Sequence, residues 1–331
     1  MSQKCELLCA EKCDDSTPIA PFDPAMISDS RILKNLLKLE LKSVNCDYFR
    51  TGIQPELEPK MRKVLTTWMF EVCLEQRCEA QVFPLGVKLL DRYLAQGKVH
   101  KVHLQLLACV CLLTATKLRQ CRALGVDLLV YYTDYSITAE EIRQWEQLLL
   151  VKLGWDVASI TAYDFIDPLV EVIPSCRRSR RPRRNQETET PTSPVPDPVS
   201  PLRESSVDDE TLSKIRDHAQ TYVALCCTEY EFMQTAPSLL ASACVTLAIT
   251  DLKIERAANI LDLMVQYTNG DRMRICSVLH RIKTLIAQQL AELDVLRQKS
   301  AHVGNAASKH QEVLDADGNP ETPTDVQDVI F

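Results

Sequence analysis

The stretch LQLLACVCLLTATKL, residues 104–118, decides the fold of this chain of 331 residues. From Leu104 to Thr116 it carries no charge on any face, so a helix formed by it must be surrounded by other helices. The run is shorter than the about 20 residues that a bilayer-spanning helix needs. We therefore predict the core helix of a globular domain and expect no membrane partner.

Lys117 follows this uncharged run directly. A cation in the last turn of a helix gains about 0.3–1 kcal/mol from the helix dipole, which is one interpretation of Lys117. Glu146 lies on a later predicted helix, between Trp145 and the apolar stretch 148–151, and it offers a second one as an ion-pair partner. The residues alone leave both interpretations open.

The chain is predicted to be all-α. Apolar residues recur at helical spacing in residues 60–153 and 208–297, and only 8 glycines occur. The first stretch divides into five helices, with breaks near residues 81, 96–99, 120–125 and 134–138. Thr138 and Glu141 form a capping-box pattern that begins the fifth helix. The second stretch predicts helices around residues 212–227, 238–250, 256–267 and 273–296.

We expect five segments along the chain. The first, residues 1–29, is predicted to be a flexible terminus, and residues 30–174 a helical unit whose first helix is short and amphipathic, over residues 30–44. Six arginines within Arg177–Arg184 and then a Pro/Ser/Thr-rich stretch predict a disordered linker over residues 175–206. Residues 207–299 form a second helical unit, and residues 300–331 are a predicted disordered tail.

Composition excludes several classes of function. The net charge of −7 gives no general attraction to nucleic acid or anionic lipid. Charged residues near the N-terminus argue against a secretory segment, so the 14 cysteines are expected to be mostly free, buried thiols in a reducing compartment. Cys5, Cys9 and Cys13 lack the paired spacing of a structural zinc site, so no metal or cofactor is expected. No phosphate loop, nucleophile elbow, zinc-protease or kinase motif predicts an enzyme.

A wide apolar arc lies on the first long helix. Met61, Val64, Leu65 and Trp68 follow the i, i+3, i+4, i+7 pattern. Leu57, Met69, Val72 and Cys73 widen the arc to about half of the helix circumference, more than the ~100° that a one-sided surface helix needs. Either this is a central core helix, or part of the arc lines an exposed groove.

Several ordered motifs resemble the cyclin box, and within that family the D-type cyclins. They are MRKVLTTWMFEVCLEQRCEAQVFPLGVKLLDRYL (61–94), the stretch 104–118 and YYTDYSITAEEIRQWEQLLLVKLGWDV (131–157), while RDHAQTYVALC (216–226) resembles the second D-type box. The resemblance implies two tandem five-helix cyclin boxes preceded by a short helix. It also implies a non-catalytic subunit that binds and activates a G1 cyclin-dependent kinase and promotes the G1/S transition.

The resemblance implies roles for particular residues. Lys117 and Glu146 match the lysine and glutamate with which cyclins grip the regulatory helix of the kinase. A groove that binds docking motifs of substrates and kinase inhibitor proteins falls on Met61, Val64, Leu65, Trp68, Glu71, Leu104 and Gln105.

Two short motifs outside the boxes also resemble D-type cyclins. Leu7, Cys9 and Glu11 form the L-x-C-x-E pattern that these cyclins use to bind a retinoblastoma-type pocket protein, and the alternate spacing suits capture as an extended peptide. Thr322, followed by Pro323, resembles the C-terminal threonine whose phosphorylation directs export and destruction.

The arginine-rich run departs from the family, whose D-type members join the boxes by a short link. It is either a solvated loop or a nuclear import signal, and we expect the protein in the nucleus and the cytoplasm. Two other functions stay open: a cyclin-fold transcription adaptor that contacts DNA, against which the overall acidity argues, and a kinase-independent scaffold.

Overall fold

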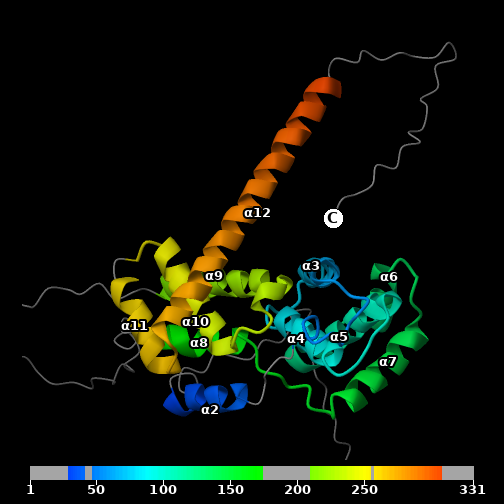
Figure 1. The fold of residues 1–331 in the computed structure, drawn as a ribbon, viewed down its shortest axis with the longest axis horizontal. Helices are drawn as coiled ribbons and strands as arrows, with labels where there is room; N and C mark the ends of the chain where they lie inside the picture. Colours follow the sequence, from blue (N-terminus) through cyan, green and yellow to red (C-terminus); the bar gives the residue numbers. More distant parts are fainter. Residues whose placement is uncertain (1–28, 42–46, 174–208, 255–256, 308–331) are drawn as a thin grey trace, which may run out of the picture.

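The computed structural model describes residues 29–41, 47–173, 209–254 and 257–307, and every regular element within these ranges is a helix (Figure 1). The predicted all-α class is thereby confirmed. The helices are α2 (Ser30–Glu40), α3 (Pro59–Glu75), α4 (Val82–Leu94), α5 (Leu104–Arg119), α6 (Val126–Tyr132), α7 (Ala139–Lys152), α8 (Tyr163–Glu171), α9 (Asp209–Thr228), α10 (Pro237–Asp251), α11 (Ala257–Thr268) and α12 (Arg272–Ala307), with 3-10 turns η1 (Lys101–His103) and η2 (Tyr230–Phe232).

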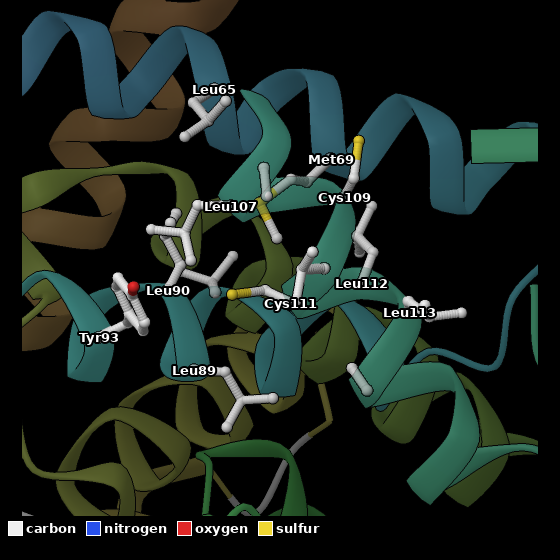
Figure 2. Close-up of a cluster of buried hydrophobic side chains, with 14 of the residues drawn as sticks. Leu65, Met69, Leu89, Leu90, Tyr93, Leu107, Cys109, Cys111, Leu112 and Leu113 are labelled. Atoms are coloured by element: carbon white, nitrogen blue, oxygen red, sulfur yellow. The ribbon is translucent and has the colours of Figure 1, made fainter. Parts of the chain in front are cut away.

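Helix α5 is the core helix of the first unit, as its charge-free sequence predicts. Every residue from Leu106 to Thr116 is buried, and α3, α4 and α7 pack around it. Figure 2 shows this core, with side chains of α3 and α4 against those of α5. The stretch 101–119 is long and apolar enough by composition to cross a membrane, but 67% of its most apolar window lies inside the fold.

Helix α10 occupies the equivalent place in a second core. Its residues Ser238–Ile249 are all buried, and α8, α9, α11 and α12 pack around it. Helix α12 projects from the fold in Figure 1 and runs to Ala307, past the predicted end of this unit at residue 299.

The packing differs from the predicted domain boundary at residue 174. Helix α8 lies before that boundary, but Phe165, Ile166 and Leu169 are buried in the second core. Helix α2 was expected to accompany the first unit, and it packs instead against α8, α10 and α11. Each core therefore has five main helices around it, and the second unit begins before the linker.

A buried arginine joins the two units. Arg62 of α3 donates to both carboxylate oxygens of Asp91 on α4, at 2.8 Å each, and Tyr48 donates to Asp91 at 2.9 Å. The third guanidinium nitrogen of Arg62, Nη1, donates at 3.2 Å to the carbonyl oxygens of Cys227 and Thr228, in the last turn of α9. The last carbonyls of a helix lack intrahelical donors, so a side chain of the first unit caps a helix of the second.

The charge of Arg62 is maintained by its partner. Burial alone would lower the pKa of the guanidinium, but the Asp91 carboxylate outweighs this effect, and the pKa is raised above its ordinary value. Both side chains are almost fully excluded from solvent, at 3% and 5% exposure. Arg62 therefore stays charged inside the protein.

We predict that Arg62→Ala lowers the free energy of unfolding by about 3–5 kcal/mol, because it leaves the buried Asp91 carboxylate without its ion-pair partner. The matched control is Lys98→Ala, whose side chain is 49% exposed and pairs with Glu56 at 2.7 Å. An exposed pair of this kind is worth about 0–1 kcal/mol. Urea unfolding followed by circular dichroism measures both variants. Equal losses would contradict the role given to Arg62.

Candidate functional site

The structure brings Lys117 and Glu146 together. Lys117 lies in the last turn of α5, and its Nζ is 2.6 Å from Oε1 of Glu146 on α7. The lysine side chain is 48% exposed and the glutamate side chain 18%. The two polar groups thus meet at the rim of the first core, with the lysine facing solvent.

The rotation of α7 explains why Glu146 is half-buried. Thr138 and Glu141 form the predicted capping box, which is confirmed and starts the helix at Ala139. Ile142 and Leu149 are the buried residues of α7, and Glu146 lies four residues after one and three before the other, on the same face. The core-facing side of α7 therefore carries Glu146 to the end of α5.

This ion pair adds little to stability. An exposed or half-exposed lysine–glutamate pair is worth about 0–1 kcal/mol in solution. What the pair does achieve is order: each side chain holds the other in place beside an exposed helix end. Such an arrangement is suited to meeting hydrogen-bonding groups of a partner.

An exposed tryptophan extends this surface, and the sequence analysis did not single it out. Gly154 and Trp155 have left-handed φ values of 63° and 61°. The Trp155 N–H donates to the Leu150 carbonyl at 2.9 Å, which is the Schellman ending that brings those two side chains close. Leu150 lies one turn after Glu146. Glu146, Leu150 and Trp155 therefore form one strip along α7 and its end, and Trp155 is 71% exposed. Gly154, a glycine just past the end of α7, is the sequence feature that could have indicated this helix ending.

The predicted groove residues fall into two groups. Met61 and Leu65 of α3 and Leu104 of α5 line one small surface hollow together with Phe49 and Leu57. The other four do not line it: Val64, at 51% exposure, and Glu71 are exposed on α3, and Trp68 and Gln105 are half-buried.

The apolar arc on α3 is divided between the core and the surface. Met69, Val72 and Cys73 are buried in the first core, whereas Met61 and Val64 reach the surface.

Other predicted sites lie outside the described residues. These are Leu7, Cys9 and Glu11, Thr322, the arginines 177–184, and the cysteines at positions 5 and 13. In the part of the chain that the structure describes, no group of three or more His, Cys, Asp or Glu side chains is arranged to hold a metal ion.

Comparison with protein families matches residues 31–158 to the N-terminal cyclin domain and residues 201–313 to the C-terminal cyclin domain. The chain is 34% identical to G1/S-specific cyclin-D2 of Xenopus laevis, over 98% of this chain and 99% of that protein. It belongs to the cyclin family. This cyclin is also 33% identical to human G1/S-specific cyclin-D3, over 97% of this chain and 98% of that protein.

A solved viral cyclin from herpesvirus saimiri shares the fold of this cyclin, with a TM-score of 0.62 at 20% identity, over 78% of this chain and 97% of the viral one. The two units are accordingly cyclin boxes, and the resemblance to D-type cyclins is confirmed. Cyclins are regulatory rather than catalytic subunits of protein kinases, which confirms the interpretation of the chain as a non-enzyme.

Proposed function

We propose that this cyclin binds and activates a cyclin-dependent kinase of the G1 class and so promotes the G1/S transition. The similarity to cyclin-D2 and cyclin-D3 along the whole chain supports this proposal. The observation that carries it is the Lys117–Glu146 pair at an exposed helix end. The phosphoryl transfer stays in the kinase, whose regulatory helix must move so that the catalytic Lys–Glu pair of the kinase can form.

The charges of the pair supply the polar part of the grip. A lysine ammonium has three donors, and Lys117 gives one of them to Glu146. Its remaining donors are available for carbonyl groups of the kinase, while the glutamate holds the ammonium in position. Docking would remove water from the pair, and losing one member of a desolvated interfacial pair costs about 2–5 kcal/mol.

Leu150 and Trp155 supply the apolar part. They continue from Glu146 along one strip of α7 and its end. A large aromatic ring that is 71% exposed on a folded protein is the kind of side chain that anchors interfaces. We propose that Trp155 packs against the regulatory helix of the kinase beside the polar grip.

Lys117→Glu is expected to weaken kinase binding roughly 30-fold or more, from the about 2 kcal/mol lower bound for a desolvated charge pair. Lys98→Glu is the matched control, because Lys98 is 49% exposed and pairs with Glu56 at 2.7 Å, nearly the geometry of Lys117. Co-purification with candidate kinases and assay of kinase activity compare the two. If Lys117→Glu binds and activates like the wild type, the interface is assigned to the wrong place.

Trp155→Ala is expected to cost about 2 kcal/mol or more of kinase-binding free energy, the range of interface hot spots. Val151→Ala is the control: Val151 is 68% exposed, but it lies five residues after Glu146, on another side of the helix. Isothermal titration with the same kinase measures both. The strip is not an interface if the two variants bind equally well.

We propose two routes for substrate recruitment. Proteins with docking motifs, including kinase inhibitors, would bind the groove, part of which, Met61, Leu65 and Leu104, surrounds one small hollow. A retinoblastoma-type pocket protein would capture Leu7, Cys9 and Glu11 as an extended peptide. The two routes use different parts of the chain, so they can be tested separately.

Cys9→Gly is predicted to weaken binding to a pocket protein and to leave kinase binding intact, because the motif lies outside the boxes. Cys5→Gly makes the same chemical change at a neighbouring cysteine outside the motif. Pull-down with a purified pocket protein tests both. Unchanged binding by Cys9→Gly, or an equal loss with Cys5→Gly, makes the pattern a coincidence.

We propose that the protein works in the nucleus and the cytoplasm. Six arginines in eight residues at 177–184 support nuclear import. Thr322, before Pro323, supports phosphorylation that directs export and destruction, and a phosphate there would add about two negative charges.

A further inference from the structure

The end of α3 places two cysteines side by side. Cys78 N–H donates to the Cys73 carbonyl at 2.9 Å, and Arg77 N–H donates to the Leu74 carbonyl at 3.1 Å. Arg77 has a left-handed φ of 49°. These features define a Schellman ending, in which the side chains at the positions of Cys73 and Cys78 come into contact. An apolar pair usually fills that place, and here two thiols fill it, close enough to shift each other's pKa.

The two thiols have different surroundings. Cys73 is 6% exposed, whereas Cys78 is only half-buried. The interaction between the two thiols lowers the pKa of Cys78, with a further contribution from the Gln120 side chain, and raises the pKa of Cys73. Because the thiolate is the reactive form, Cys78 is the member of the pair that is better suited to react first, and the buried Cys73 is its neighbour.

The other cysteines in the described part of the chain do not combine these properties. Cys226 and Cys244 also lie close together, but both are fully buried and their interaction raises the pKa of Cys226. Burial raises the pKa of Cys109 to about 12. Cys121 is exposed. Cys226 and Cys244 thus form a natural comparison, a paired dithiol without access for an oxidant.

We propose that Cys73 and Cys78 are a redox-active dithiol that a peroxide converts into an intramolecular disulfide. The Cys78 thiolate attacks one peroxide oxygen, the O–O bond breaks, and water leaves after proton uptake, which gives a sulfenic acid. The Cys73 sulfur then attacks the Cys78 sulfur, the S–S bond forms, and the hydroxyl leaves as a second water with the Cys73 proton. Two thiols lose two electrons and two protons, and hydrogen peroxide becomes two waters.

The dithiol is connected to the helix end that carries Lys117. Glu79, next to Cys78, donates its N–H to the Gln120 side chain at 3.3 Å, and Gln81 donates to the Arg119 carbonyl at 3.1 Å. The turn that would hold the disulfide therefore packs on the C-terminal end of α5. Oxidation would fix the conformation of a segment that supports this end.

Trypsin provides a direct test, because it cleaves after Arg77, between the two cysteines. The reduced full-length chain is treated with hydrogen peroxide, its remaining thiols are alkylated, and it is digested without reductant. Mass spectrometry is expected to find peptides 64–77 and 78–88 joined, with two hydrogens fewer than their sum. Cys78→Ser should abolish the joined product, and Cys244→Ser should not change it.

A second variant keeps the test decisive. Cys73→Ser removes the buried thiol, so Cys78 should stop at the sulfenic acid, which dimedone labels. The proposal is overturned if wild-type Cys78 oxidises without joining Cys73, if it joins Cys121 instead, or if Cys226 and Cys244 join at a lower peroxide concentration.

Discussion

One guanidinium group connects the two cyclin boxes. Arg62 satisfies Asp91 inside the first box and caps the last carbonyls of α9 in the second. A buried ion pair by itself is weak support for stability, because taking two charges out of water is costly. A planar fork with donors in fixed directions nevertheless restricts where its acceptors can lie. Arg62 therefore contributes more to the relative orientation of the two boxes than to the free energy of their association.

The surfaces that face partners depend on this junction. Met61 and Arg62 are neighbours on α3, and both line the surface hollow with Leu65 and Leu104. Arg62 fixes the rotation of α3 from the inside, and the rotation presents Met61 to the outside. At the other end of α3 lies the dithiol, and from there hydrogen bonds reach the end of α5. The groove residues, the dithiol and Lys117 thus all lie on, or at the end of, helices α3 and α5 of the first core.

Sequence reasoning succeeded where one local property decides the outcome. A run without charge, Leu104–Thr116, leaves burial as its only stable arrangement, and Thr138 with Glu141 fixes a helix start by chemistry alone. It missed α8, a short helix with Pro168 inside it, because proline ordinarily ends a helix. It also did not indicate that α2 packs against α8, α10 and α11, since an apolar stripe does not say which surface covers it.

The candidate site was less predictable than the fold. Helical periodicity gives Lys117 and Glu146 no reason to meet, because they lie 29 positions apart. The residues offered their ion pair only as one of two interpretations, and the resemblance to cyclins gave the pair a role. Trp155 and Cys78 both owe their positions to left-handed backbone at a helix end. At Trp155 a glycine announces that conformation, whereas at Cys78 it is adopted by Arg77, a residue type that gives no such signal.

The place of α8 in the chain has a consequence for connectivity. This helix precedes residues 174–208 in sequence, but its apolar side is buried with α9 and α10, which follow them. A break in the chain between residues 174 and 208 would leave α8 covalently attached to the first box and buried in the second. The two pieces would stay associated through a shared core. Such a break would fall inside the second box, and packing in its core, rather than the chain between α8 and α9, would hold the two pieces together.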